Sequence, residues 1–493
     1  MPDNFTHLHA VVLAGGSGAR FWPLSRELRP KQLLSIFGGV SLITRAVTRI
    51  MPFAGADAVH LVTGENLFDE LRNHLMSQPA LEGLHIDYMV EPLGRNTAPA
   101  IALAAAALVR VDPDAVIVVL PSDHLLEDGQ EWRDAVTSAY YLAGQGFLVT
   151  IGLVPSRPET GYGYIHAGEP IPGSEAGTAR GHRVIEFIEK PNAYTAAEFV
   201  RDGGYLWNSG MLVARADAVL RELRVAGDAA KTPASADGRR IADVAEALAS
   251  MPRSSWITDE GRALYSSLPS VPFDKAALEV SATVAVVPTG MAWSDVGSLL
   301  SIEELGTPDI NGNVLVGRAT DVDSHNVLAY APDRLVATLG LDSVIVVDTA
   351  DATLVAARDR VQDVRLVVDA LRAVGAEEVV SARSSLRPWG SWTLLMRADG
   401  FQIKSIDVLP GQRLSKQSHE HRSEHWIVID GTARIMRDAE TIDLVRNESI
   451  YLPAGAVHRL ENPGDVPLKV IEVAVGDYLG EDDIVRFEDD WDR

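Results

Sequence analysis

Short apolar runs alternate with helical patterns along the first third of the chain, and this alternation limits the folds open to it. The runs are HAVVLAG, AVHLVTG, LHIDYMVEP and DAVIVVLPSDH, and the alanine-rich stretch APAIALAAAALV between the last two is typical of a buried helix. Strands interleaved with helices predict an α/β domain with a parallel, doubly wound, Rossmann-like sheet. Ligands of such sheets bind beyond the carboxyl ends of the strands, so we expect a binding site there.

The rest of the chain predicts two further domains, because 493 residues exceed what one core supports. We place the α/β domain at 1–305 and a small β-rich connector at 306–380, where short β-type segments with Asp, Asn and Gly turns precede one amphipathic helix. Residues 381–493 alternate in a strand pattern that predicts an all-β barrel or sandwich. We expect TPASADG (232–238) to be a flexible loop and the acidic end GEDDIVRFEDDWDR to be a solvated face or terminus.

Composition limits the kinds of partner and the location that we expect for the chain. Hydrophobic residues make up 46% and charged residues 23%, which is typical of a globular protein, and the longest apolar stretch is too short to span a membrane. A formal net charge of −24 argues against nucleic acid as a partner. The chain has no cysteine and no evident export signal, so we expect a cytoplasmic protein. Whether it forms a homo-oligomer is left open.

The stretch AGGSGAR follows the first apolar run and is a candidate phosphate site. Gly15, Gly16 and Gly18 would let backbone N–H groups approach a polyphosphate closely, while Arg20 and Lys31 would add positive charge to a departing pyrophosphate. The loop lacks the GK[ST] of a P-loop and the third glycine of a dinucleotide fingerprint. Taken alone, it is also the pattern of a tight turn after a strand.

Two aspartates follow apolar runs elsewhere in the predicted α/β domain. Asp123 comes after VIVVL, and Asp295 lies in AWSDVGS after the run TVAVVP. Carboxylates at strand ends can hold Mg²⁺, which prefers a few oxygen ligands and bridges to phosphates. For either aspartate alone, a helix cap or a turn is the more common role.

A second group of candidate ligands lies near the C-terminus. Gln417 and His419 are two residues apart on a predicted strand, so they point to one face, and turns can bring Glu424 and His458 to the same point. Mixed nitrogen and oxygen ligands suit Zn²⁺ or another divalent metal with an open coordination position. The alternative is an ordinary polar surface.

The first 300 residues resemble the sugar-1-phosphate nucleotidylyltransferases, and among them the mannose-1-phosphate guanylyltransferases. The matching stretches are LAGGSGARFWPLSRELRPKQ, EPLGRNTAPAI, VLPSDH, TGYGYI, FIEKP, LWNSGM and WSDVGS, in the order that the family has. The resemblance implies that GTP and mannose 1-phosphate react to give GDP-mannose and pyrophosphate. For the nucleotide, it implies that the triphosphate is cradled by Gly15, Gly16, Gly18 and Arg20 and activated by Lys31, and that Gly94, Arg95, Asn96 and Thr97 lie near the nucleotide. It implies that Mg²⁺ is held by Asp123 and Asp295. It also implies that the sugar phosphate is surrounded by Gly163, Glu189, Lys190 and Asn208.

The C-terminal stretches PGQRLSKQSHEHRSEHW and LPAGAVHRLEN resemble the double motif of the cupins, and residues 386–487 resemble the type II phosphomannose isomerases. The resemblance implies a cupin barrel that interconverts mannose 6-phosphate and fructose 6-phosphate through an enediol. It implies Gln417, His419, Glu424 and His458 as metal ligands, and we assign Arg422 to a phosphate or enediolate contact. No residue of the sequence stands out as the base that transfers the proton.

Three alternatives remain open at this point. The cupin could be a non-catalytic binding or dimerisation module behind an active transferase. The chain could be a nucleotide-sugar sensor without catalysis, although the presence of Arg20, Lys31, Asp123 and Asp295 argues against it. Finally, the chemistry could apply to another sugar or another base.

Overall fold

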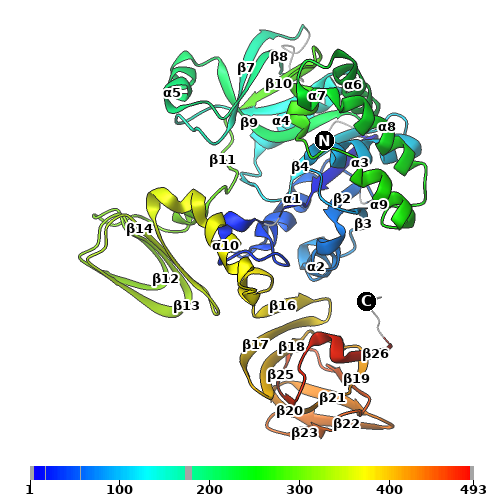
Figure 1. Ribbon diagram of the computed structural model, residues 1–493, viewed down its shortest axis with the longest axis vertical. Coiled ribbons are helices and arrows are strands. Elements are labelled where there is room, and N and C mark those ends of the chain that lie inside the picture. The colour runs from blue at the N-terminus through cyan, green and yellow to red at the C-terminus, as the bar shows by residue number, and fades with distance from the viewer. Residues whose placement is uncertain (1–4, 17, 56, 173–179, 489–493) are drawn as a thin grey trace.

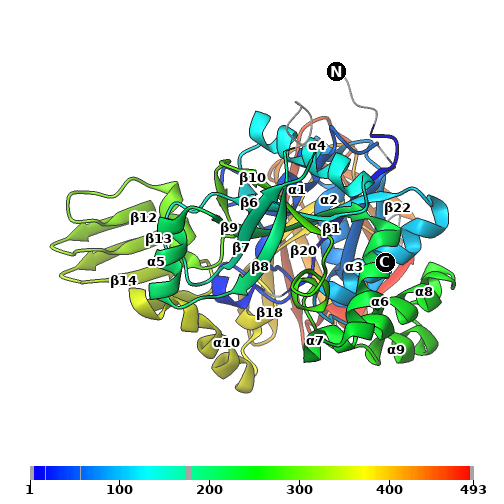
Figure 2. The ribbon, with the colours of Figure 1, turned by 90° about the horizontal axis from the view of Figure 1, so that it is seen from above.

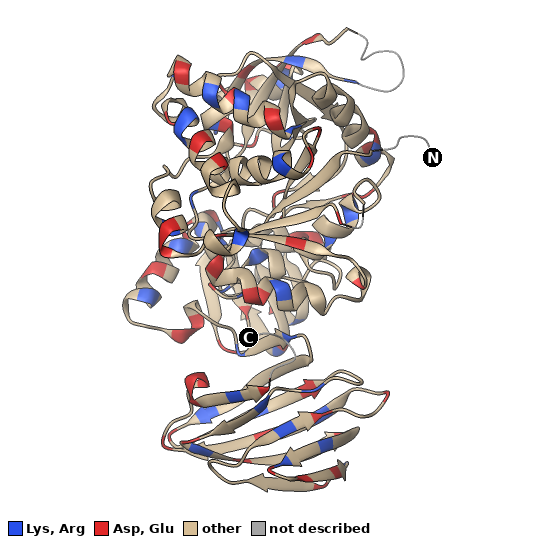
Figure 3. Cartoon of the chain, turned by 90° about the vertical axis from the view of Figure 1, so that its right-hand side faces the viewer, with Lys and Arg blue, Asp and Glu red and all other residues tan. Residues whose placement is uncertain are grey.

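The computed structural model describes residues 5–16, 18–55, 57–172 and 180–488. Figure 1 shows three parts in chain order: a large sheet flanked by helices, a small sheet that follows it, and a C-terminal barrel. None of the helices in these ranges has the length and the apolar character that a membrane crossing requires. Lys and Arg are interspersed with Asp and Glu over the chain in the view of Figure 3.

A nine-stranded sheet forms the first part, in the order β3-β2-β1-β4-β9-β6-β10-β8-β7. Its strands are β1 (Leu8–Leu13), β2 (Val59–Gly64), β3 (Ile86–Glu91), β4 (Val116–Pro121), β6 (Leu148–Leu153), β7 (Gly163–Pro170), β8 (His182–Glu189), β9 (Tyr205–Arg215) and β10 (Val284–Thr289). The two-residue strands β5 (Leu125–Leu126) and β11 (Trp293–Ser294) pair beside it.

The sheet is mixed, which corrects the expectation of a parallel one. β1 to β4 pair in parallel, as do β6 and β10, but β9 runs antiparallel to both β4 and β6. The chain enters β9 after the antiparallel hairpin of β7 and β8, and β9 also pairs with β7. The chain passes through α5 (Ala193–Asp202), between β8 and β9, before it forms β9, and β9 then runs antiparallel to β7 as well as to β4 and β6. Its direction is therefore opposite to that of the first four strands.

Helices cover both faces of the sheet, which confirms the doubly wound α/β class (Figure 2). On β1, Ala10 and Val12 pack against one face and Val11 against the other, as a strand buried on both sides requires. The first face is covered by α1 (Leu42–Ile50), α2 (Glu65–Met76) and α4 (Gln130–Gly144), and the second by α3 (Thr97–Val111), α6 (Ala216–Ala229), α8 (Gly238–Ala249) and α9 (Asp259–Ser266). Helix α5 (Ala193–Asp202) packs near β9.

The alanine-rich stretch forms helix α3, as predicted, and its residues from Ala98 to Leu108 are buried. The prediction of a flexible loop at 232–238 is wrong. These residues form the short helix α7 (Pro233–Ala236), where Thr232 and Ser235 cap each other, and then begin α8. The reciprocal cap satisfies backbone donors that a loop would leave to water.

The connector is a four-stranded sheet of β12 (Val314–Val322), β13 (Leu328–Leu339), β14 (Val344–Asp348) and β15 (Thr353–Ala357), followed by α10 (Val364–Ala373). The pairs β12–β13 and β13–β14 are parallel. The connector shares a hydrophobic core with the segment that follows the glycine loop, including Phe21, Trp22 and Leu34. An ion pair of 2.8 Å between Arg26 and Asp351 fixes the same contact.

The C-terminal part is all β, as predicted, and its two sheets close on an apolar core around Trp426 and Leu468. The strands are β16 (Ser384–Arg387), β17 (Gly390–Ala398), β18 (Phe401–Val408), β19 (Lys416–His419), β20 (Arg422–Asp430), β21 (Thr432–Arg437), β22 (Glu440–Val445), β23 (Ser449–Leu452), β24 (His458–Glu461), β25 (Leu468–Gly476) and β26 (Ile484–Glu488). The acidic end is not merely a solvated terminus, because β26 pairs with β19. Its last residues, 489–493, lie outside the described residues.

Candidate active sites

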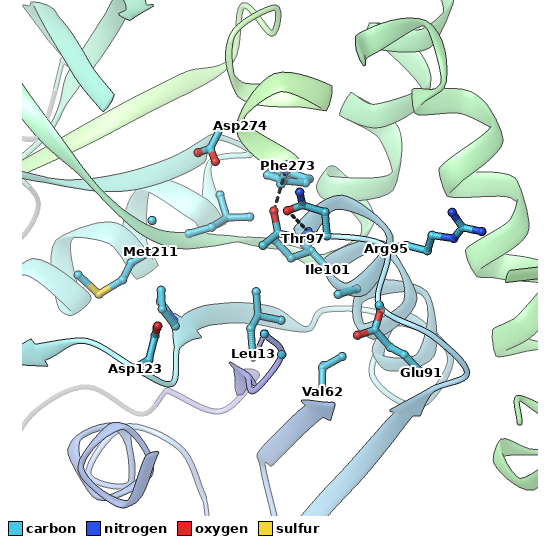
Figure 4. A pocket seen from close by; sticks show the side chains of 18 of the residues that line it. Leu13, Val62, Glu91, Arg95, Thr97, Ile101, Asp123, Met211, Phe273 and Asp274 are labelled. Atoms are coloured by element: carbon cyan, nitrogen blue, oxygen red, sulfur yellow. Dashed lines mark hydrogen bonds between the residues drawn. The ribbon is translucent and has the colours of Figure 1, made fainter. Parts of the chain in front are cut away.

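A cavity of about 550 Å³ lies at the carboxyl ends of β1 and β4, where the sequence predicted a site. Figure 4 shows Leu13 and Asp123 on one side of it and Thr97, at the start of α3, on the other. The predicted nucleotide residues Gly15, Gly16, Gly94, Arg95, Asn96 and Thr97 all line this cavity. At the N-terminus of α3, which borders this cavity, the N–H of Thr97 donates to Oδ1 of Asn96 at 2.9 Å and the N–H of Ala98 donates to the carbonyl oxygen of Val271 at 3.1 Å.

The glycine loop requires glycine at specific positions. Gly16 and Gly18 have φ angles of 93° and 59°, in the left-handed region that favours glycine. A Cβ atom on Gly18 would lie 2.8 Å from Cβ of Lys31. Gly18 thus allows the loop to lie directly against the segment that carries Lys31.

The ammonium of Lys31 joins the two predicted metal-binding segments. Its Nζ lies 2.7 Å from Oδ2 of Asp123 and donates hydrogen bonds to the carbonyl oxygens of Asp295 and Val296, at 2.7 and 3.1 Å. Burial raises the pKa of Asp123, but the charges of Lys31 and His124 outweigh burial, and the net pKa lies below its ordinary value. Asp123 therefore stays ionised at neutral pH.

Arg20, Lys31, Asp123 and Asp295 line a second cavity of about 550 Å³ that shares Asp123 and His124 with the first. The two cavities adjoin at these two residues. Arg20 is exposed within it, whereas Lys31 is buried.

The four predicted sugar-phosphate residues also come together. Gly163 and Glu189 are paired across β7 and β8, and a Cβ atom on Gly163 would lie 2.8 Å from Oε2 of Glu189. The Nζ of Lys190 lies 2.7 Å from Oε1 of Glu189. Asn208 donates a hydrogen bond of 3.0 Å to Oδ1 of Asp274, which lines the first cavity.

In the barrel, His419, Glu424 and His458 offer ligand atoms that lie within 4.8 Å of one another. All three side chains are buried at 2% exposure. Nε2 of His419 is 3.1 Å from Oε1 of Glu424 without hydrogen-bond geometry, and neither ring nitrogen of His419 nor Nε2 of His458 has a hydrogen-bond partner among the described residues. Buried nitrogens without partners are costly, and a shared metal ion would satisfy them.

Gln417 and Arg422 lie beside these three residues. Gln417, on β19, is the cross-strand partner of His458 and lines a cavity of about 300 Å³ together with Arg422 and Glu424. Arg422 is 3% exposed, and it donates from Nε to Oε1 of Glu424 at 3.2 Å and from Nη1 to the carbonyl of Gly480 at 2.9 Å. The structure therefore holds the Arg422 guanidinium in one orientation at the cavity wall.

Charges in this cavity act on one another. Burial raises the pKa of Glu424, but His419, His458 and Arg422 outweigh burial and lower it. Burial and the charge of Glu424 raise the pKa of Glu472, a further buried carboxyl group in the cavity wall. The two carboxyl groups thus have pKa values shifted in opposite directions.

Known proteins are similar to this chain over almost its whole length. The model of the nucleotidyl transferase family matches residues 9–310, and the chain is 42% identical over 487 residues to the xanthan biosynthesis protein XanB of Xanthomonas campestris pv. campestris, with 98% of each chain covered. It is 41% identical to the mannose-1-phosphate guanylyltransferase of Escherichia coli K12 over 493 residues, with 99% of each chain covered. The chain belongs to the mannose-1-phosphate guanylyltransferase family.

Other comparisons cover the remaining domains of this family member. Residues 317–371 match the MannoseP isomerase/GMP-like beta-helix domain, and residues 374–489 match the mannose-6-phosphate isomerase C-terminal family. The crystal structure of mannose-1-phosphate geranyltransferase from Thermus thermophilus is similar, with a TM-score of 0.62 and 31% identity over 74% of this chain and 99% of that one. The family resemblance and the fold class predicted from the sequence are thereby confirmed.

Sequence reasoning missed residues from other domains at both sites. Arg365 and Arg372 of α10 line the second cavity, so the connector adds cations beside Arg20. Asp69 and Asn73 of α2 line the barrel cavity, and Glu70 of the same helix lies 3.0 Å from Arg387. Periodicity within one domain gives no signal for such contacts, because they depend on how the domains pack.

Glu91 is a further residue that sequence reasoning did not single out, although it begins the matching stretch EPLGRNTAPAI. It ends β3, is 6% exposed and lines the nucleotide cavity (Figure 4). It accepts a hydrogen bond from the hydroxyl of Tyr265. Burial raises its pKa to about 7, and the hydrogen bond only partly offsets this.

The raised pKa of Glu91 predicts a loss of stability as pH rises. The folded protein holds this proton more tightly than the unfolded chain does, so the contribution of Glu91 falls between the ordinary pKa of 4.5 and about 7. At about 1.4 kcal/mol per pKa unit, this lowers the free energy of unfolding by about 3 kcal/mol. We expect Glu91→Gln to remove this loss, so that its melting temperature relative to wild type increases from pH 5 to pH 8. An equal difference at both pH values, measured by calorimetry, would contradict the assignment.

Proposed function

We propose that this protein transfers GMP from GTP to mannose 1-phosphate, giving GDP-mannose and pyrophosphate, and that its barrel interconverts mannose 6-phosphate and fructose 6-phosphate. The observation that carries the proposal is the position of the glycine loop and of the pair formed by Lys31 and Asp123 at two adjoining cavities. Asn208 is linked to the wall of the first cavity through its hydrogen bond to Asp274. We divide the chain into a transferase at 1–305, a connector at 306–380 and an isomerase at 381–493. We expect the protein to act in the cytoplasm.

In the transfer step, a phosphate oxygen of mannose 1-phosphate attacks the α-phosphorus of GTP in line with the bond to the departing pyrophosphate. The attacking oxygen is already an anion, so positioning and charge neutralisation are the main demands on the protein. Gly15, Gly16 and Gly18 hold the phosphates through backbone N–H groups, and Arg20 and Lys31 neutralise charge on the leaving pyrophosphate. Gly94, Arg95, Asn96 and Thr97 line the nucleotide end of the cleft. There, Glu91 offers acceptor oxygens to the N–H groups of guanine.

Asp123 and Asp295 fit a magnesium ion. Their segments already surround one cation, the Lys31 ammonium, and both side chains line the polyphosphate end of the cleft. Bound Mg²⁺ would neutralise charge on the phosphate oxygens during transfer. The hydroxyl of Tyr162 donates a 3.0 Å hydrogen bond to Oδ1 of Asp295 and so orients this carboxylate.

The sugar side of the cleft carries one matched pair of charges. Lys190 supplies a cation for the phosphate of mannose 1-phosphate, and Glu189 holds its ammonium. Gly163 leaves room for the carboxylate of Glu189, and Asn208 is held by Asp274. Tyr162, which precedes Gly163 in the chain, donates to Asp295, so a sugar phosphate at Gly163 would bind near Asp295.

Lys190→Ala tests this assignment. The variant loses the cation that would contact the sugar phosphate, so we expect the KM for mannose 1-phosphate to rise about 10-fold to 100-fold, the loss typical of one charge-assisted contact. The KM for GTP and the isomerase kcat should stay within twofold of wild type. A KM that rises for GTP instead would place Lys190 on the nucleotide side.

In the barrel, Gln417, His419, Glu424 and His458 suit Zn²⁺ or a similar divalent ion, because the set combines nitrogen and oxygen donors. Such an ion would polarise the substrate oxygens and stabilise an enediolate. Arg422, fixed by Glu424 and Gly480, presents its guanidinium to the phosphate or the enediolate.

Two assays on one purified protein test the proposed function. Pyrophosphate release is measured over a panel of nucleoside triphosphates and sugar 1-phosphates, and fructose 6-phosphate formation is measured with mannose 6-phosphate. We expect GTP with mannose 1-phosphate to give the highest kcat/KM. Preference for another pair would change the substrates, and no transfer with any pair would favour a sensor. Stoichiometric metal without isomerisation would leave the barrel a binding or dimerisation module.

A further inference from the structure

The barrel cavity contains a glutamate that the metal-ligand set does not use. Glu472, on β25, is 6% exposed and lines the cavity together with Gln417, Arg422 and Glu424. Its carboxylate has no hydrogen-bond or ion-pair partner within the described part of the chain. Buried carboxylates are normally paired, because the loss of water around a charge is costly. A partner that arrives with the substrate would account for this one.

Strand register places Glu472 beside the ligand cluster. Glu472 is the cross-strand partner of Lys404 on β18 and of Trp426 on β20, while Ala474 is the partner of Glu424. Directly paired residues lie on the same face of a sheet, and diagonal neighbours are about 7–8 Å apart. Glu472 therefore faces the barrel interior diagonally from Glu424.

The neighbouring charged groups are already engaged with one another. Nζ of Lys404 lies 2.6 Å from Oε1 of Glu481, so its charge acts on Glu472 from a distance without forming an ion pair with it. The two oxygens of Glu424 contact His419, Arg422 and the indole N–H of Trp426. Glu472 is thus the carboxylate beside the ligand cluster that remains available to a substrate.

We propose that Glu472 is the catalytic residue that carries the proton between C2 and C1 of the sugar phosphate, a role that rests on the isomerase function proposed above. The Glu472 carboxylate takes the proton from C2 of open-chain mannose 6-phosphate. The electron pair of that C–H bond forms the C1=C2 bond, and the π pair of the C1 carbonyl moves to O1, giving an enediolate. Glu472 then returns the proton to C1 while the proton on O2 passes to O1, which leaves the C2 carbonyl of fructose 6-phosphate.

The test compares Glu472→Gln with Glu481→Gln and wild type, all as full-length, metal-loaded protein. Both substitutions keep the shape of the side chain, and both residues line the same cavity. The measurements are kcat and KM for mannose 6-phosphate, the loss of deuterium from C2 of [2-²H]mannose 6-phosphate, and the molar content of Zn²⁺. We expect Glu472→Gln to lower kcat and deuterium loss about 10³-fold with KM and Zn²⁺ content near wild type. Glu481→Gln should lower kcat less than tenfold.

Each other outcome counts against the proposal. Glu472→Gln with kcat within tenfold of wild type would overturn it, as would a loss of deuterium exchange in Glu481→Gln instead. If Glu472→Gln fails to fold or to hold Zn²⁺, the test uses Glu472→Asp instead. This variant keeps a carboxylate, so it should retain measurable deuterium loss if Glu472 carries the proton, and no deuterium loss would contradict the role. Wild-type protein without turnover or exchange would overturn the isomerase function itself and this role with it.

Discussion

Replacing Glu424 by alanine is expected to abolish stoichiometric metal binding in the barrel and to lower isomerase kcat at least about 10³-fold. Glu424 contacts His419 and Arg422 at 3.1 and 3.2 Å, and its other oxygen lies 3.7 Å from His458. Truncation removes a ligand and also leaves the buried Arg422 guanidinium without its carboxylate. Transferase kcat/KM should stay within twofold of wild type, because its cleft lies in another domain. Metal content by mass spectrometry and the two activity assays measure this.

The matched control is Glu424→Gln, which keeps the shape of the side chain and still accepts a hydrogen bond from Arg422. Breaking a buried ion pair by truncation costs about 3–5 kcal/mol, so Glu424→Ala should also lower the unfolding temperature of the barrel. The glutamine variant should lower it less while still binding metal more weakly than wild type. Full metal content and normal turnover in a folded Glu424→Ala protein would show that Glu424 is not a ligand.

Lys31→Met is expected to lower transferase kcat at least about 10²-fold and to leave the isomerase unchanged. The substitution removes the positive charge near the leaving pyrophosphate, and it also removes the cation 2.7 Å from Asp123. Without Lys31, less positive charge offsets the effect of burial on Asp123, so the pKa of Asp123 should rise. The acidic limb of the pH–rate profile should therefore move to higher pH.

Lys31→Arg provides the control for charge alone. A guanidinium keeps the positive charge but differs in shape from the ammonium that contacts Asp123, Asp295 and Val296. We expect an activity between those of wild type and Lys31→Met. A transferase kcat in Lys31→Met within threefold of wild type, with an unchanged pH profile, would contradict the role assigned to Lys31.

Much of the architecture follows from local patterns in the sequence. The apolar runs became β1 to β4, and the alanine-rich stretch became α3, because side-chain periodicity decides such elements. Three of the predicted ligands, His419, Glu424 and His458, lie close together in the structure, and alternation on β19 places Gln417 and His419 on one face of the strand. The sequence separation of residues on one strand predicts which face they share, whereas the meeting of β19, β20 and β24 depends on the closure of the barrel.

Features that depend on distant contacts could not be predicted in this way. The direction of β9 depends on its return from the β7–β8 hairpin, and no residue of β9 signals it. Arg365 of the connector and Asn73 of α2 lie on the polar faces of amphipathic helices, and from the sequence such faces are expected to contact only solvent. In the structure these two residues line cavities because the domains pack together. Glu472 lies in an alternating strand, where only the register with Lys404 and Trp426 shows that it faces the cavity.

The central claim is that one chain carries two separate active sites, and metal-dependent isomerisation tests it most directly. Purified protein is treated with a chelator, dialysed, and assayed for fructose 6-phosphate formation from mannose 6-phosphate before and after addition of Zn²⁺, Co²⁺ or Mn²⁺. We predict that turnover is lost on chelation and restored by at least one of these ions, at about one ion per barrel. No turnover with any of them, in protein that still makes GDP-mannose, would contradict the account and leave the barrel without catalysis.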